Sequence, residues 1–90
     1  MILENNHINL VLKDTGWVLK GKSITKTFKF DSFGVAIQFV NQVADISDER
    51  NHYPQIEINK DRVKLFLSTH DEGGVTDMDI TLAADIDELE

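Results

Sequence analysis

A wide apolar stripe in the middle of the chain most constrains its fold. Between Phe33 and Ile46, apolar residues recur at intervals of three and four, which is the spacing of one face of an α-helix. Asp31 precedes the stripe as the expected N-cap, and the polar residues 47–50 are expected to end the helix. Because the stripe is wide, we expect it to contact both a sheet and a partner subunit. Its members are Phe33, Ala36, Ile37, Val40, Val43 and Ala44, widened by Val35, Phe39 and Ile46.

Shorter alternating segments on both sides of this helix predict two β-hairpins. Side chains of a strand alternate between two faces, and in residues 24–30 this places Ile24, Lys26 and Phe28 on one face. Polar or glycine-containing segments between the alternating runs predict the turns. The expected elements are a helix within residues 2–12, strands at 17–19 and 24–30 with a turn at 20–23, the helix at 33–46, strands at 56–58 and 63–67 with a turn at 59–62, and a final helix over 77–89.

The start of the final helix carries a capping-box pattern. Thr76 is placed to be the N-cap, and Asp79 follows three residues later, where its carboxylate can accept a hydrogen bond from the N-cap amide. Val75 and Ile80 have the spacing of a hydrophobic staple around this pair. The helix is therefore expected to begin directly after Thr76.

The length and the order of elements together predict one domain. A chain of 90 residues is long enough for a single hydrophobic core, so we expect one domain over residues 1–90. The order is α-β-β-α-β-β-α. We expect an α+β fold in which a four-stranded antiparallel sheet carries helices packed on one face, because this is the simplest packing that buries every apolar stripe.

The composition excludes some classes of partner. Nine basic and sixteen acidic side chains give a net charge of −7, which repels the phosphates of nucleic acids and anionic membrane surfaces. We therefore expect no direct binding to nucleic acid or membrane. The sequence contains no Cys, and its first residues lack the pattern of a signal peptide, so we expect a cytoplasmic protein. A chain this short buries a smaller fraction of its surface on folding than a longer chain does, and such chains often gain stability by self-association. We therefore also expect self-association.

Two histidines are placed where they could carry chemistry. Histidine exchanges protons near neutral pH, and His52 and His70 stand just before the first arm and just after the second arm of the second hairpin. A hairpin brings its two ends together, so we expect both histidines at one edge of the sheet. Asp71, Glu72 and Asp79 are close enough to His70 in sequence to orient it. Such a pair suits general acid–base catalysis.

Structural roles for the same residues remain open on this reasoning. His52 could cap the preceding helix, His70 could end a strand, and Asp79 could serve only in the capping box. The third histidine, His7, is expected on the surface. The sequence contains no ligand pair at short spacing, such as His-x-x-x-His or Cys-x-x-Cys, so we expect no metal site.

Two runs of sequence form a recognisable pattern. The first is Asp-Glu-Arg-Asn-His-Tyr-Pro at 48–54, and the second is Leu-Ser-Thr-His-Asp-Glu-Gly-Gly-Val-Thr at 67–76, followed by Asp79. This resembles the pattern of the pterin-4a-carbinolamine dehydratases: an acidic residue, three others, His-His-Pro or His-Asn-Pro, then Thr-His and a later Asp. Upstream, residues 16–17 and 28–31 are also similar to the family, so the resemblance covers nearly the whole chain.

The resemblance implies an enzyme of tetrahydrobiopterin biosynthesis. Members of this family remove water from 4a-hydroxytetrahydropterin and give the quinonoid dihydropterin, without cofactor or metal. By resemblance, His52 and His70 are the acid–base pair, Asp79 supports His70, and Tyr53 occupies the position of a second motif histidine. The family assembles as homodimers or homotetramers. The residues that the resemblance places around the flat pterin are Asp48, Asn51, Pro54, Ser68, Thr69 and Asp71.

Departures from the family pattern leave other functions open. A tyrosine phenol has a pKa of about 10 and is a poor base at neutral pH, so Tyr53 weakens the implied catalysis. Ile56 and Lys60 stand where the family pattern has aromatic residues, so the pocket is expected to have less apolar surface. The second hypothesis is therefore a non-catalytic interaction or assembly protein, like the relatives of this fold that act as a transcription-factor dimerisation cofactor or a Rubisco assembly factor. A third is a pterin-linked enzyme with another substrate, such as a molybdopterin-related compound.

Overall fold

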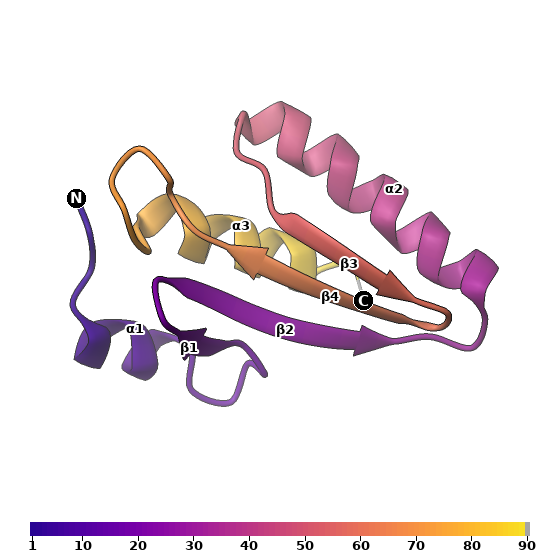
Figure 1. Ribbon diagram of the computed structural model, residues 1–90, viewed down its shortest axis with the longest axis horizontal. Coiled ribbons are helices and arrows are strands. Elements are labelled where there is room, and N and C mark those ends of the chain that lie inside the picture. The colour runs from indigo at the N-terminus through magenta and orange to yellow at the C-terminus, as the bar shows by residue number, and fades with distance from the viewer. Residues whose placement is uncertain (90) are drawn as a thin grey trace.

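The computed structural model describes residues 1–89, which fold as a sheet covered by helices (Figure 1). The α+β class and the order α-β-β-α-β-β-α are confirmed. None of the helices within residues 1–89 is long and apolar enough to cross a membrane. The elements are α1 (Asn5–Val11), β1 (Val18–Lys20), β2 (Ser23–Lys29), α2 (Phe33–Arg50), β3 (Gln55–Asn59), β4 (Arg62–Leu67) and α3 (Asp77–Asp87).

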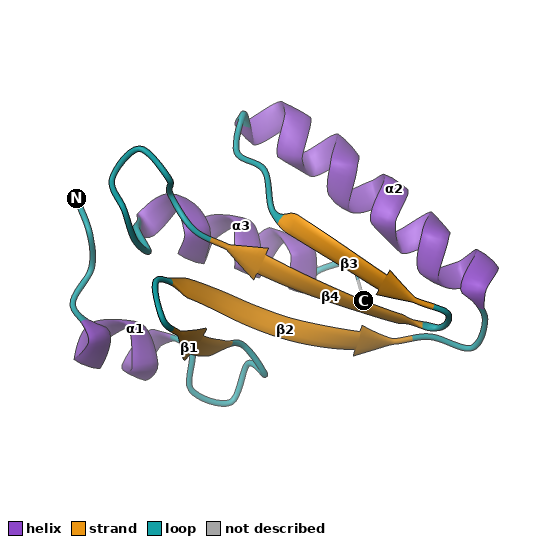
Figure 2. Cartoon of the chain, viewed as in Figure 1, coloured by secondary structure: helices purple, strands orange, loops and turns teal. Residues whose placement is uncertain are grey.

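The four strands form one antiparallel sheet in the order β1-β2-β4-β3 (Figure 2). Each predicted hairpin pairs its own arms, and the two hairpins join through β2 and β4. In this central pairing Ile24 lies opposite Leu67, and Phe28 lies opposite Val63. Because side chains alternate along a strand, this register places the apolar residues of both hairpins on the same face.

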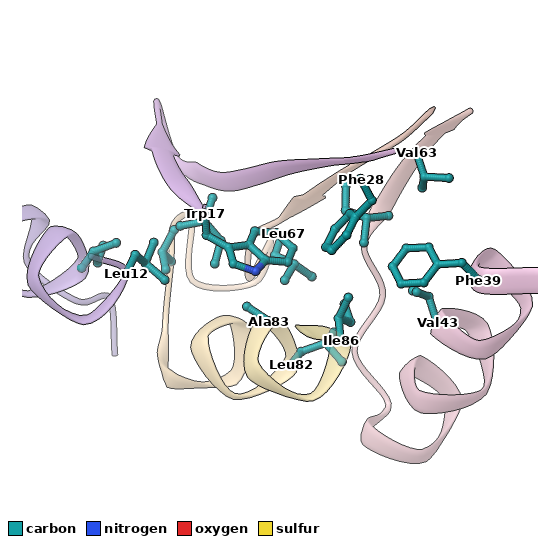
Figure 3. Packing of buried hydrophobic residues seen from close by; sticks show 14 of the residues in the cluster. Leu12, Trp17, Phe28, Phe39, Val43, Val63, Leu67, Leu82, Ala83 and Ile86 are labelled. Atoms are coloured by element: carbon teal, nitrogen blue, oxygen red, sulfur yellow. The ribbon is translucent and has the colours of Figure 1, made fainter. Parts of the chain in front are cut away.

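The hydrophobic core lies between this face of the sheet and helices α2 and α3 (Figure 3). Phe28 of β2 packs against Phe39 of α2, with 4.8 Å between the ring centroids. Leu82 and Ile86 of α3 are buried in the same cluster. Since full burial of one large apolar side chain contributes about 1.5–3 kcal/mol, these contacts hold both helices on one face and fix the position of their ends.

Both ends of α2 differ from the prediction. The N-cap is Ser32 rather than Asp31: Ser32 has an extended backbone, and its Oγ accepts a hydrogen bond of 3.1 Å from the amide of Val35. The polar residues 47–50 do not end the helix but form its last turn. The helix ends at Asn51, which has a left-handed conformation with φ 53°, a conformation that asparagine tolerates better than most residues.

The buried face of α2 is narrower than the predicted stripe. Ala36, Phe39 and Val43 are buried against the core. Phe33 and Ala44, both predicted as members of the stripe, are exposed, Phe33 by 54%. One sheet covers only part of the circumference of a helix, so the rest of this wide stripe is uncovered in the single chain.

The start of α3 is as predicted. Thr76 is the N-cap, and its Oγ accepts a hydrogen bond of 3.3 Å from the amide of Met78. The carboxylate of Asp79 accepts a hydrogen bond of 2.9 Å from the amide of Thr76, which completes the capping box. Asp79 is fully buried, with 0% exposure.

A polar contact explains why Lys26 lies on the apolar face of β2. Its ammonium group donates hydrogen bonds to the backbone carbonyl of Thr15, at 2.7 Å, and to Oδ1 of Asp87, at 2.9 Å. The indole of Trp17 donates to the same carboxylate oxygen at 3.0 Å. This cluster ties the segment before β1 and the last turn of α3 to the sheet.

Candidate functional site

A pocket of about 330 Å³ lies at one end of the second hairpin, next to the start of α3. Figure 1 shows that the segment after α2 and the loop after β4 lie at the same end of the sheet. His52 and His70 both line the pocket, so the predicted closeness of the two histidines is observed. The lining residues are Asn51, His52, Tyr53, Ser68, Thr69, His70, Asp71, Glu72 and Met78.

His52 is paired with a buried carboxylate. Nε2 of His52 lies 2.5 Å from Oδ1 of Asp79, and His52 itself is only 9% exposed. The other oxygen of Asp79 accepts hydrogen bonds from the hydroxyl of Thr69, at 2.8 Å, and from the amide of Thr76, at 2.9 Å. The expectation that Asp79 supports His70 is therefore wrong: the carboxylate holds His52. Helix α3 presents this side chain to the segment after α2, a contact between residues 27 positions apart.

The end of α2 determines where His52 lies. The left-handed Asn51 turns the chain out of the helix, and the amide of His52 donates a hydrogen bond of 3.1 Å to the carbonyl of Ser47. Pro54 follows and cannot continue the helix, since it has no amide hydrogen. The backbone of His52 is thus fixed by its hydrogen bond to Ser47, and its imidazole is held by Asp79.

His70 has a different environment. It is exposed and lies in the loop from Thr69 to Gly74, which is closed by a hydrogen bond of 2.9 Å from the amide of Thr69 to the carbonyl of Gly74. Gly73 has φ 79°, a conformation that favours glycine, and its amide donates to the carbonyl of Thr69 at 2.9 Å. The loop therefore presents the His70 imidazole to solvent at the pocket, where it can exchange protons with water.

Tyr53 is exposed at the rim of the pocket. Its hydroxyl donates a hydrogen bond of 3.1 Å to Oδ1 of Asp48, and 55% of the residue is exposed. This hydrogen bond raises the pKa of Tyr53 above its ordinary value of 10.0, with further contributions from desolvation and from the charge of Asp48. A phenol with a raised pKa stays protonated at neutral pH, so Tyr53 can donate a hydrogen bond but cannot act as a base there.

Some residues of the site differ from those expected. Of the residues that the resemblance places around the pterin, Asp48 and Pro54 do not line this pocket, although Asp48 holds Tyr53 at its rim. Two lining residues, Glu72 and Met78, were not among the expected pterin contacts. Glu72 stands beside His70 in the motif loop, whereas Met78 has the spacing of a core residue, so its sequence pattern alone gives no sign of a pocket.

The described part of the chain, residues 1–89, shows no cluster of three or more His, Cys, Asp or Glu side chains that could hold a metal ion. The pocket has several side chains that can take part in chemistry. It offers an imidazole oriented by a buried carboxylate, a second and exposed imidazole, and several polar side chains able to bind a small ligand. This arrangement suits proton transfer to and from a small molecule.

Comparison with known proteins agrees with this geometry. Residues 2–89 match the family model described as pterin 4 alpha carbinolamine dehydratase. The chain belongs to this family. A protein of Sulfurisphaera tokodaii, named provisionally as a pterin-4-alpha-carbinolamine dehydratase, is 49% identical to it over 77 residues, which cover 86% of this chain and 83% of the relative.

Solved structures related to the pterin carbinolamine dehydratase family have the same fold. The crystal structure of a transcriptional coactivator/pterin dehydratase from Brucella melitensis matches with a TM-score of 0.91 at 33% identity, covering 99% of this chain and 98% of the other. A pterin dehydratase-like protein described as a RuBisCO assembly factor of the alpha-carboxysome matches with a TM-score of 0.67 at 24% identity, covering 81% and 84%. The second match shows a shared fold only. Proteins with this fold are therefore named both as pterin dehydratases and as a coactivator or assembly factor.

Proposed function

We propose that the protein is a dehydratase that converts 4a-hydroxytetrahydropterin to the quinonoid dihydropterin in tetrahydrobiopterin biosynthesis. The observation that carries the proposal is the His52–Asp79 pair, which is buried and lies at a pocket shared with His70. Family membership supports the choice of a pterin substrate. The pocket volume of about 330 Å³ falls at the small end of the range for ligand sites, about 300–1,000 Å³.

The reaction breaks the bond between C4a and its hydroxyl oxygen, removes the proton of the adjacent ring N–H, and forms a C=N bond. A base has to take the ring proton while an acid protonates the departing hydroxyl, which leaves as water. Because Asp79 engages Nε2 of His52, His52 accepts the ring proton at Nδ1, and the carboxylate stabilises the imidazolium that results. His70 supplies the proton to the hydroxyl. Exchange with water then restores both histidines.

The polar residues around the two histidines are proposed to bind the flat ring. Asn51, Ser68 and Asp71 line the pocket with side chains that can donate to or accept from a pterin edge. Tyr53 lies at the rim, where its ring can stack on the substrate. Tyr53, which stands where the family pattern has a second histidine, thus contributes to binding. His52 acts as the base of the reaction.

A dehydration assay tests the proposal. The protein should accelerate dehydration of synthetic 4a-hydroxytetrahydropterin above the rate in buffer. His70→Ala should remove most of the acceleration, and so should His52→Gln, whose amide can still donate to Asp79 and so avoids leaving a buried charge unpaired. His7→Ala is the matched control, since His7 is exposed on α1, and it should keep the full rate. A wild-type rate no higher than that of buffer would exclude this function.

The second candidate is a non-catalytic interaction or assembly protein. Tyr53 favours it, because its phenol is hydrogen-bonded to Asp48 and cannot replace a histidine as a base. Under this hypothesis the wild-type protein has no turnover and forms a stoichiometric complex with a protein partner. Tyr53→His separates the two candidates: it should increase the rate of an enzyme whose site is weakened by the tyrosine, and it should leave an assembly protein inactive.

We also propose that the chain acts in the cytoplasm as a homodimer or homotetramer. The uncovered part of the α2 stripe supports self-association, because Phe33 is 54% exposed and Ala44, about three turns further along the same side of the helix, is also exposed in the single chain. Light scattering after size-exclusion chromatography should give a mass of two or four chains. Phe33→Glu should lower that mass if this face of α2 is the contact, whereas a monomeric wild type would contradict the assignment.

A further inference from the structure

We propose that Thr69 and Thr76 are positioning residues that fix which nitrogen of His52 carries a proton. The inference rests on the proposed function in one respect, namely that His52 acts on the substrate. It assigns Thr69, which the family resemblance places against the pterin, to a role inside the protein. The two threonines act through Asp79 and not through a hydrogen bond to the substrate.

The hydrogen bonds between these residues run in one direction. The amide of Met78, which can only donate, donates to Oγ of Thr76 at 3.3 Å. The two threonine hydroxyls are 2.8 Å apart, and the hydroxyl of Thr69 donates to Oδ2 of Asp79 at 2.8 Å. The amide of Thr76 donates to the same oxygen at 2.9 Å. Since the hydroxyl proton of Thr69 goes to Asp79, the hydroxyl of Thr76 donates to Thr69, and the chain of donors ends at the carboxylate.

The direction of these hydrogen bonds determines which nitrogen of His52 carries the proton. Oδ2 of Asp79 is occupied by two donors, and Oδ1 is the oxygen that faces His52. A buried carboxylate accepts hydrogen bonds and does not donate them, so Nε2 of His52 carries the proton. The lone pair of the neutral ring is then on Nδ1. Asp79 thus sets the tautomer of His52, and the hydroxyl of Thr69, itself hydrogen-bonded to that of Thr76, keeps the carboxylate turned so that Oδ1 faces Nε2.

Thr69 has no free polar group for a ligand. Its amide donates to the carbonyl of Gly74, and its carbonyl accepts from the amides of Glu72 and Gly73. Its hydroxyl is bonded to Thr76 and Asp79, and Thr69 as a whole is buried. The residue therefore links the loop that carries His70 to the carboxylate that holds His52, so both proposed catalytic residues depend on its position.

The test compares three changes at Thr69 with one matched control. Thr69→Val removes the hydroxyl at nearly constant shape, Thr69→Ser keeps it, and Thr69→Cys replaces it with a weaker donor. Thr25→Val is the control, because Thr25 is also buried in the sheet but its hydroxyl has no hydrogen-bond partner among the described residues. Heteronuclear NMR of the imidazole nitrogens reports the tautomer of His52, and the dehydration assay reports kcat.

We expect the wild type, Thr69→Ser and Thr25→Val to show a protonated Nε2 and similar kcat values. Thr69→Val should show a mixture of tautomers, with kcat lower by about tenfold to a hundredfold, the range found for outer hydrogen-bond partners of metal-bound histidines. Thr69→Cys should have a tautomer population and a kcat between those of the wild type and Thr69→Val. It serves as the test if the valine variant does not fold.

Three outcomes are decisive. An unchanged tautomer in Thr69→Val and Thr69→Cys would overturn the inference, whatever the activity. Equal losses in Thr69→Ser and Thr69→Val would also overturn it, because the hydroxyl would then be irrelevant. A tautomer change in a protein whose wild type has no dehydratase activity would support the positioning role and reject the proposed function, so the two failures are distinguishable.

Discussion

Replacing Asp79 by asparagine should invert the protonation of His52 without unfolding the protein. Asparagine has nearly the same size as aspartate, but its two terminal atoms differ. The amide of Thr76 can only donate, so the carbonyl oxygen of the new side chain has to face it and the hydroxyl of Thr69. The new NH₂ group then faces Nε2 of His52. A hydrogen bond forms there only if Nε2 gives up its proton, which moves that proton to Nδ1 and removes the lone pair from the pocket.

The expected loss of stability is modest. A hydrogen bond to a charged group contributes about 1.5–3 kcal/mol and a neutral one about 0.5–1.5 kcal/mol, so weakening the contacts to His52, Thr69 and Thr76 would cost about 3 kcal/mol. Removing the charge of Asp79 from a fully buried position also removes its desolvation penalty, which offsets part of this loss of stability. We therefore expect a net loss of about 1–2 kcal/mol, well below the 5–15 kcal/mol typical of a domain.

The expected loss of activity is much larger. In serine proteases, replacing the aspartate of the catalytic triad by asparagine leaves the geometry intact but gives the wrong histidine tautomer, and kcat falls by about 10⁴. Here the second histidine of the pocket is unaffected, so we expect a decrease in kcat of about a hundredfold or more, up to that limit. KM should change little, because Asp79 does not line the pocket.

Two measurements check this prediction. Urea unfolding gives the stability, and the dehydration assay gives kcat for the wild type and Asp79→Asn. Asp45→Asn is the control, since it makes the same chemical change at an exposed position of α2. If Asp79→Asn is folded and its kcat is within about twofold of the wild-type value, a difference worth less than 0.5 kcal/mol, the assignment of His52 as a base oriented by Asp79 is refuted.

Two further predictions concern other parts of the chain. Asp87→Ala should lower the free energy of unfolding by about 1–3 kcal/mol, because it leaves the partly buried Lys26 and the Trp17 indole without their shared acceptor, and urea unfolding followed by tryptophan fluorescence measures this. A loss below about 0.3 kcal/mol would show that water replaces the carboxylate. Asp48→Asn should lower the pKa of Tyr53 towards 10.0, because it weakens the hydrogen bond that the phenol donates and removes the negative charge that opposes formation of the phenolate. Tyr53 is the only tyrosine, so its phenolate absorbance as pH rises gives this pKa directly, and an unchanged pKa would contradict the role assigned to Asp48.

The features predicted correctly from the sequence depend on local spacing. The capping box of Thr76 and Asp79 involves residues three positions apart, and the two hairpins depend on alternation and short turns. Local spacing also led to the wrong N-cap. Asp31 and Ser32 are both good capping residues, and the choice between them depends on the backbone at the end of β2, which propensity does not specify.

The features that were not predicted depend on contacts between distant elements. The pairing of Asp79 with His52 joins residues 27 positions apart, and it exists only because α3 packs beside the end of α2. Lys26 is similar: its place on an apolar face is explained by Asp87, which lies 61 positions away. Sequence proximity suggested His70 as the partner of Asp79. Three-dimensional packing gives the carboxylate a different partner and so reverses which histidine is held in place.

The energetics of the His52–Asp79 pair bear on the choice between enzyme and assembly protein. Burying a carboxylate is expensive, and an apolar pair of similar volume often gives equal or greater stability at such a position. The capping box of α3 accounts for the contact between Asp79 and Thr76, but it does not require a histidine at the other carboxylate oxygen. The carboxylate is buried while the histidine that it holds lines a pocket with a second histidine. Under the proposed function, chemistry in the pocket explains the placement of the pair, and we therefore give the pair more weight than Tyr53 in favour of an enzyme.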